Sequence, residues 1–277
     1  MGVDERGRES PEKRDRREAR QIEERSEPRT PIIYEIVRKR GDEEMARPAT
    51  SLWWSGVAAG LSMSFSLLTM AILFTHLPDT SWRRLVTSAG YPVGFLIVIL
   101  GRQQLFTENT ITAVLPVMKH FTLHNLARLA RMWTIVFLAN MVGTLFAAYF
   151  CTLTPVISPE LREAMLQVSA ESVKNGWIVT FFHAISAGFL IATTVWLIPG
   201  AETAKFWVIA LFTFLIGAGG FAHIIAGSVE TFMLVANGRL DVLSMLGGFT
   251  LPTLLGNIVG GSALFALISY AQVMEEI

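Results

Sequence analysis

The chain of 277 residues has little from which a catalytic or metal centre is usually built. Cys151 is its only cysteine, which excludes an intrachain disulfide and a cysteine-based metal site. The sequence has no HExxH, GxSxG or GxxxxGKS/T motif and no GxGxxG after a strand. The Asn-Pro-Ala pair of water and glycerol channels is missing too. We therefore expect no enzyme, no bound metal and no cofactor.

Net charge is also lacking, and the charges present are unevenly placed. Lys+Arg and Asp+Glu number 23 each, so nothing indicates a nucleic-acid partner. Residues 1–50 hold 13 of the 23 basic and 13 of the 23 acidic residues. Residues 1–30 have too few apolar side chains to offset the entropy of ordering, which predicts a disordered, charged cytoplasmic tail. Ile32, Ile33, Ile36 and Val37 follow a helical spacing and predict an amphipathic helix at 31–48.

Apolar residues are what the sequence has in excess. They make up 52% of the chain, and the mean hydropathy is +0.46, above that of an ordinary soluble domain. We therefore predict a transmembrane domain at 49–277, embedded in a lipid bilayer. Six segments are long enough to cross it: 52–77, 91–118, 126–150, 177–198, 206–236 and 249–273.

Two of these segments are unsuited to a continuous membrane helix. The second carries Gln103, Gln104 and Thr107-Glu108-Asn109 at its middle, and each unsatisfied polar group in hydrocarbon costs roughly several kcal/mol. The fifth contains Gly217-Ala218-Gly219-Gly220, which is too rich in glycine to remain regular. We predict an all-α membrane protein whose second and fifth helices are broken. Breaks at bilayer depth indicate a permeation site rather than an anchor.

The two halves of the chain resemble each other. Asn140-x-Val142-Gly143 matches Asn257-x-Val259-Gly260, while Thr107 precedes Asn140 by 33 residues and His223 precedes Asn257 by 34. Because three spans per half is an odd number, the second half must be inserted upside down, which predicts an inverted 3+3 repeat. Six spans put both termini on one side, and the positive-inside rule favours the cytoplasm.

Thr107 and His223 are the first candidates for a polar site in the passage. A neutral imidazole donates a hydrogen bond, and a protonated one attracts an anion. The Thr107 hydroxyl can donate to His223 or to a solute. The structural alternatives are a histidine bonded to a backbone carbonyl and a threonine that caps a half-helix. Phe106 and Phe221 flank these residues, either as hydrophobic constrictions or as packing residues.

Other polar residues are expected to support this site. Asn140 and Asn257 are expected to hold the irregular loops through backbone bonds. We expect Glu108 to cap the following half-helix, although a carboxylate near a pore repels anions. Glu230 raises the same difficulty, with a salt bridge or a helix surface contact as the alternative. Lys174 either attracts anions to a pore mouth or is an exposed loop lysine.

At these residues the chain resembles the formate–nitrite transporter family, over about residues 50–275. The resemblance is carried by Leu105-Phe106-Thr107, Asn140-x-Val142-Gly143, Phe221-x-His223 with Ile225-Ala226, and Gly256-Asn257-Ile258-Val259-Gly260-Gly261. The charged tail is similar to that of a divergent branch of the family. The resemblance implies an aquaporin-like protomer and a homopentamer. It also implies one pore per protomer for small monovalent anions such as formate, nitrite, hydrosulfide, acetate and lactate.

The resemblance also assigns roles to residues. The family's central histidine falls on His223, its loop threonine on Thr107 and its lysine before the fourth span on Lys174. Gln104 and Ala222 stand where the family often has glutamates. The implied function is an anion channel or transporter of the bacterial inner membrane, with proton linkage through His223 as one form. A pore for neutral small solutes, or a closed membrane scaffold whose tail recruits partners, are the alternatives.

Overall fold

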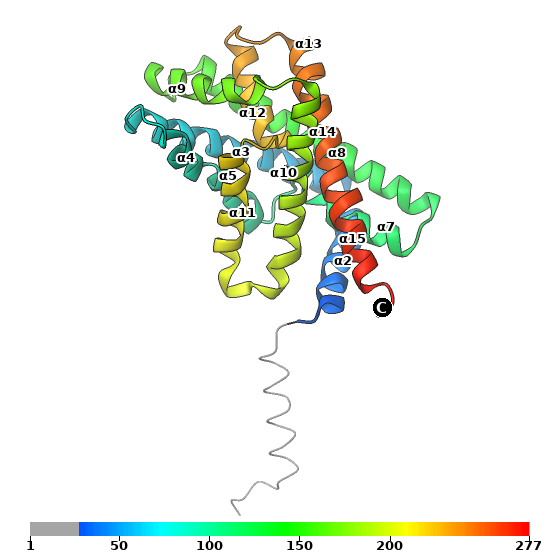
Figure 1. Cartoon of the computed structure of the whole chain (residues 1–277). Coiled ribbons are helices and arrows are strands. Elements are labelled where there is room, and N and C mark those ends of the chain that lie inside the picture. The colour runs from blue at the N-terminus through cyan, green and yellow to red at the C-terminus, as the bar shows by residue number, and fades with distance from the viewer. Residues whose placement is uncertain (1–27, 277) are drawn as a thin grey trace, which may run out of the picture.

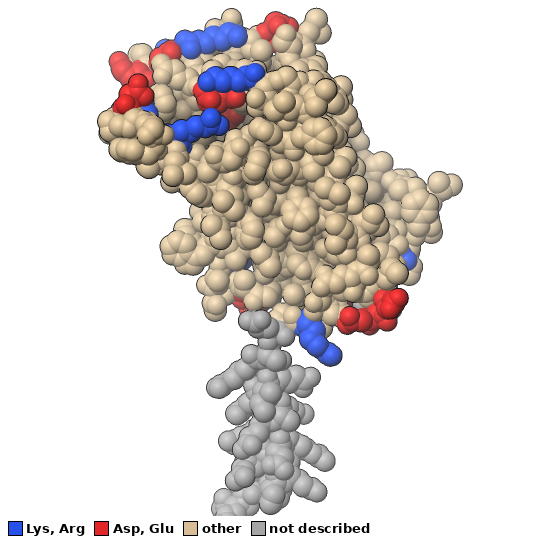
Figure 2. All heavy atoms as spheres, in the orientation of Figure 1, with Lys and Arg blue, Asp and Glu red and all other residues tan. Residues whose placement is uncertain are grey.

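The computed structural model describes residues 28–276, so the tail predicted at 1–30 lies almost wholly outside the described residues. Within that range the chain forms helices and no strand (Figure 1). Six helices are long and apolar enough to cross a membrane: Ala49–His76, Arg83–Leu100, Leu123–Leu153, Trp177–Gly200, Glu202–Gly219 and Val242–Val273. The predicted six-span, all-α fold is confirmed. Figure 2 shows an uncharged band between two charged ends of the visible face.

The helices that surround the breaks are regular over most of their length. Their bounds are α2 (Thr30–Ala46), α3 (Ala49–His76), α8 (Leu123–Leu153), α9 (Pro159–Ala170), α10 (Trp177–Leu197), α14 (Leu251–Ile258) and α15 (Leu267–Val273). The sixth span combines α13 (Val242–Ser244), α14 and α15 with π-helical turns at Met245–Thr250 and Val259–Ala266.

The second span is broken, as predicted. It begins with α4 (Arg83–Thr87) and a 3-10 turn, and continues as α5 (Pro92–Leu100). An irregular stretch follows, in which Arg102 has a φ of 51°, a value that a non-glycine residue seldom adopts. The chain becomes helical again in α6 (Asn109–Thr112) and α7 (Val114–Lys119). The polar residues of this span thus lie in a turn instead of a continuous helix.

The fifth span is broken over four residues. Helix α11 (Lys205–Gly219) ends at Gly220, whose φ of 64° lies in the left-handed region that only glycine adopts without strain. Helix α12 (Ile224–Ala236) starts after His223. The glycine-rich sequence therefore does what was predicted, since it ends one helix and lets another begin within the apolar region.

The two halves use the same close helix contact. A Cβ atom on Gly60 of α3 would lie 2.3 Å from the Asn140 carbonyl oxygen of α8. One on Gly188 of α10 would lie 2.4 Å from the Asn257 carbonyl oxygen of α14. These matched contacts agree with the sequence correspondence between the halves. The inverted orientation of the second half stays a prediction.

Helix α2 lies against the first break with only part of the face that the sequence indicated: Val37 is buried and Ile33 packs against the core. Ile32 and Ile36 are 46% and 45% exposed. The buried side is formed by Tyr34, Val37, Gly41 and Met45. Gly41 allows the contact, because a Cβ atom there would lie 1.8 Å from the Thr112 carbonyl oxygen. Helices α2 and α15 lie at the same end of the molecule, with the Tyr34 and Tyr270 rings 6.0 Å apart (Figure 1).

Candidate functional site

The two breaks meet at Thr107 and His223. Thr107 Oγ1 lies 2.7 Å from His223 Nε2, and the two residues are 0% and 1% exposed. His223 Nδ1 accepts a hydrogen bond of 3.2 Å from the Ala226 N–H and so caps α12. A ring nitrogen that accepts carries no hydrogen, so the neutral imidazole has its hydrogen on Nε2 and donates it to Thr107.

This arrangement leaves the Thr107 hydroxyl hydrogen available. Its oxygen already accepts from His223, and no other bond of this hydroxyl occurs within residues 28–276. Thr107 does not cap α6, which starts without a side-chain cap bond. The site therefore offers a hydroxyl donor, held by an imidazole whose orientation is fixed from its other side.

Aromatic rings enclose these two residues. The Phe95 ring meets the His223 ring edge-on at 4.9 Å between centroids. Phe106 is buried and packs against Trp133 and Phe137, at 5.8 and 5.3 Å. The Phe95 ring thus covers part of the His223 imidazole.

Phe221 lies in the second break, on the side of the fourth span. Its ring meets His183 edge-on at 5.9 Å. His183 Nδ1 donates a 3.1 Å hydrogen bond to the Gly220 carbonyl, so it fixes the backbone where α11 ends. The sequence analysis assigned His183 no role in the site. Within residues 28–276 no group of His, Cys, Asp or Glu side chains could hold a metal ion.

Asn140 ties the first break to its neighbours through three backbone bonds. Its Oδ1 accepts from the Phe106 N–H at 2.9 Å, and its Nδ2 donates to the carbonyls of Gly56 and Gln104, both at 2.8 Å. The residue is fully buried. These bonds satisfy backbone groups that the broken helix leaves without partners.

Asn257 does the same for the second break. Its Oδ1 accepts from the Ile224 N–H at 2.8 Å. Its Nδ2 donates to the carbonyls of Ala184 and Ala222, at 2.7 and 2.9 Å. The two asparagines thus hold the two breaks by one repeated pattern of bonds.

The repeated pattern corrects the sequence register of the two breaks. It aligns Gln104 with Ala222, and so Leu105 with His223. Counting residues back from the asparagines had paired Thr107 with His223, and that register is wrong by two residues. Thr107 reaches His223 because the first break has a longer irregular stretch before its second helix begins. Thr107 and His223 therefore occupy different positions in their respective repeats, although they are in contact.

Glu108 is not the cap that the sequence predicted. Helix α6 has no side-chain cap bond, and Glu108 Oε2 lies instead 3.4 Å from Arg40 Nη2 of α2. The carboxylate is buried, and the cation from the neighbouring helix offsets its charge, while Glu108 Oε1 has no hydrogen-bond partner within residues 28–276. Gln104 Nε2 donates to Glu44 Oε2 of α2 at 2.6 Å. Helix α2 is thereby fastened to the first break.

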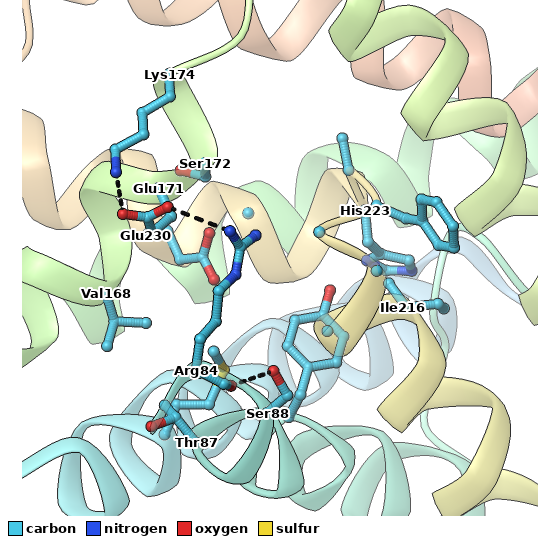
Figure 3. A pocket seen from close by; sticks show the side chains of 18 of the residues that line it. Arg84, Thr87, Ser88, Val168, Glu171, Ser172, Lys174, Ile216, His223 and Glu230 are labelled. Carbon is cyan, nitrogen blue, oxygen red and sulfur yellow. Dashed lines mark hydrogen bonds and ion pairs between the residues drawn. The ribbon is translucent and has the colours of Figure 1, made fainter. Parts of the chain in front are cut away.

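His223 belongs to the lining of a cavity of about 730 Å³ (Figure 3). Phe221, Tyr91 and Phe249 contribute to its apolar lining. The charged residues that line it are Asp79, Arg83, Arg84, Glu171, Lys174 and Glu230. Three of them are basic and three are acidic.

Two candidates from the sequence, Lys174 and Glu230, line this cavity and differ in their contacts. Lys174 is 60% exposed and pairs with Glu171. Glu230 lies further inside and makes no ion pair within residues 28–276, so the predicted salt bridge is not seen. Arg84, which lies 3.7 Å from Glu171, was missed. Its sequence signal was the Arg83-Arg84 pair before the second span.

Comparison with known sequences finds a family and several relatives. A sequence model described as "Formate/nitrite transporter" matches residues 31–271. The chain is 45% identical to the inner membrane protein YfdC of Escherichia coli K12, over 92% of this chain and 82% of that protein. It is 24% identical to the formate channel FocA of Haemophilus influenzae, over 78% of this chain and 84% of FocA.

Comparison with solved structures finds the same architecture. A pentameric formate channel with formate bound superposes with a TM-score of 0.71 at 19% identity, over 82% of this chain and 98% of the channel. An ion channel of the FNT family gives 0.75 at 21% identity, over 87% of this chain and 98% of that one. At these identities the likeness shows the fold alone.

Proposed function

Because this chain belongs to the formate/nitrite transporter family, we propose that it conducts small monovalent weak-acid anions such as formate or nitrite across a membrane. Members of this family are channels or transporters and not enzymes. The YfdC relative and the six apolar helices support a multi-pass protein of a bacterial inner membrane. The pentameric channel of the same fold supports a homopentamer. We place both termini in the cytoplasm.

The observation that carries the proposal is the hydrogen bond between Thr107 and His223 where the two helix breaks meet. We propose that an anion arriving from the cavity, which His223 lines, accepts a hydrogen bond from the free Thr107 hydroxyl, while the Nε2–H of His223 stays bonded to Thr107 Oγ1. A neutral donor holds an anion weakly enough for release, which conduction requires. Phe106 and Phe221 are the proposed constrictions on either side, and Asn140 and Asn257 keep the breaks in place.

Proton linkage through His223 would require a change in this structure. A second proton on the imidazole must go to Nδ1, which at present accepts from the Ala226 N–H. A protonated ring therefore loses its cap on α12, and the first turn of α12 must shift. We propose that His223 acts as a neutral donor in the present conformation, and that proton linkage involves movement at the start of α12.

The test separates the capping role of His223 from its contact with Thr107. Asparagine is a favourable N-cap but too short to reach Thr107, so His223→Asn keeps the cap and removes the contact. Thr107→Val removes the hydroxyl at constant shape, and Thr107→Ser restores it. In proteoliposomes we expect His223→Asn and Thr107→Val to lower formate flux about tenfold or more, the size expected for losing a buried hydrogen bond to a charged group. Wild-type flux and pH dependence in both variants would refute the proposal.

The two alternatives predict different fluxes. Formamide is a neutral analogue of formate, so a pore for neutral solutes passes formamide at least as fast as formate. A closed scaffold passes neither, and deleting residues 1–29 removes its co-purifying partners. The Arg40–Glu108 pair offsets the charge of one of the two acids, Glu108 and Glu230, that had suggested the neutral pore.

A further inference from the structure

Arg84 is a basic residue of the cavity to which neither the sequence motifs nor the relatives give a role. We propose that its guanidinium is the first docking site for the anion on its way to Thr107 and His223. We propose also that it favours planar anions with two oxygen atoms, with Glu171 as a built-in competitor. This inference rests on the proposed function, because it identifies the entrance of the same anion pathway.

The guanidinium of Arg84 has unused hydrogen-bond donors. It carries five N–H groups in a planar fork, and within residues 28–276 none of them has a hydrogen-bond acceptor. Its nearest carboxylate, Glu171, is 3.7 Å away, which is an ion pair without a hydrogen bond. The side chain is 64% exposed and points toward Glu171 across the cavity (Figure 3). An anion can therefore reach it.

Arg84 also lies where the cavity meets the second break. A Cβ atom on Gly220 would be 2.8 Å from Arg84 Nη2, so the guanidinium touches the backbone three residues before His223. Lys174 has no such contact with the break, and its ammonium group is paired with Glu171. Of the two basic residues that share Glu171, Arg84 is the one placed beside the passage.

The shape of the guanidinium gives the selectivity. Two parallel N–H groups match the two oxygens of a carboxylate or of nitrite, and such forked pairs are stronger than a point charge alone. Hydrosulfide has a single acceptor atom and gains only the charge attraction. An arriving carboxylate must displace Glu171 from Arg84, and Glu171 then keeps its bond to Lys174.

Arg83 provides a matched control. It is the neighbouring residue, has the same charge and lines the same cavity. Its guanidinium donates to the Phe74 carbonyl at 2.5 and 3.2 Å and lies 3.6 Å from the centre of the Phe74 ring. It also pairs with Asp79 at 3.6 Å. Its Nε and Nη2 groups are engaged, so Arg83 contributes to the field of the cavity without offering the fork of these two groups to an anion.

The first experiment measures formate and hydrosulfide uptake into proteoliposomes as a function of concentration. Arg84→Lys keeps the charge and loses the fork, so we expect the half-saturating formate concentration to rise about tenfold, with hydrosulfide changed less than about twofold. Arg83→Lys should leave both values unchanged, and Glu171→Gln should lower the value for formate. Equal effects of Arg84→Lys and Arg83→Lys, or a hydrosulfide value that rises with the formate value, would overturn the proposal.

A second readout does not depend on transport. Phenylglyoxal modifies exposed arginines, and the rate at Arg84 can be followed by peptide mass spectrometry in the full-length protein. Formate should slow this reaction at Arg84 and formamide should not. If the protein conducts no anion, the proposed function fails, while protection by formate still supports the docking site. If formate does not protect Arg84, the docking site is rejected whatever the flux.

Discussion

Replacing Asn257 by leucine should destabilise the protein strongly, because one side chain holds the whole second break. Asn257→Leu keeps a similar volume and removes three hydrogen bonds to Ile224, Ala184 and Ala222. At about 1 kcal/mol net for each bond, the loss is about 3 kcal/mol. The freed backbone groups lie at membrane depth, where no water replaces the lost partner, so this figure is a lower bound.

The measurement is the thermal unfolding of the purified protein in detergent, followed by circular dichroism. Asn175→Leu is the control, because it makes the same exchange at an exposed side chain. Asn140→Leu should match Asn257→Leu, since Asn140 makes the same three kinds of bond. If Asn257→Leu unfolds at the same temperature as Asn175→Leu, the bonds do not hold the break and the reasoning is wrong.

Two further predictions concern helix α2. Arg40→Leu leaves the buried Glu108 carboxylate without its cation and should cost roughly 1–2 kcal/mol of unfolding free energy, less than for a fully buried pair because Arg40 is partly exposed. Adding Glu108→Gln should restore most of that loss, and a double variant no more stable than Arg40→Leu would contradict the pairing. Hydrogen bonding to Arg38 lowers the pKa of Glu35 from 4.5 to about 2, so its stabilisation is complete above about pH 4.5 and is lost as the pH falls through about 2. The difference in unfolding temperature between wild type and Glu35→Gln should shrink over that range, and a difference that persists at pH 2 would exclude this cause.

The residues of the candidate site could be predicted from the sequence better than the contacts between them. Thr107 and His223 were found because a hydroxyl and an imidazole inside apolar segments need a reason to be there. Their 2.7 Å contact joins residues 116 positions apart, and no local pattern measures such a distance. The register of the two breaks was wrong for the same reason, because counting residues ignores how many of them an irregular turn contains.

Charged residues were the least predictable. Glu108 has the position of a helix cap, but Arg40, which is 68 residues away, determines its contact. The buried face of α2 includes Gly41 rather than Ile32 and Ile36, because a glycine lets another backbone approach. Arg84 could not be identified from the sequence, because only the folded chain shows that its guanidinium lies beside Gly220 with unused hydrogen-bond donors.

The sequence alone determined six spans and two breaks. Bilayer thickness and the cost of unsatisfied polar groups act on each segment separately, so composition and order along the chain are enough. The tertiary structure alone decided that the breaks meet, which backbone groups the two asparagines bind, and which acid each base faces. These contacts join helices that are distant in sequence, and their geometry follows from packing across the whole domain.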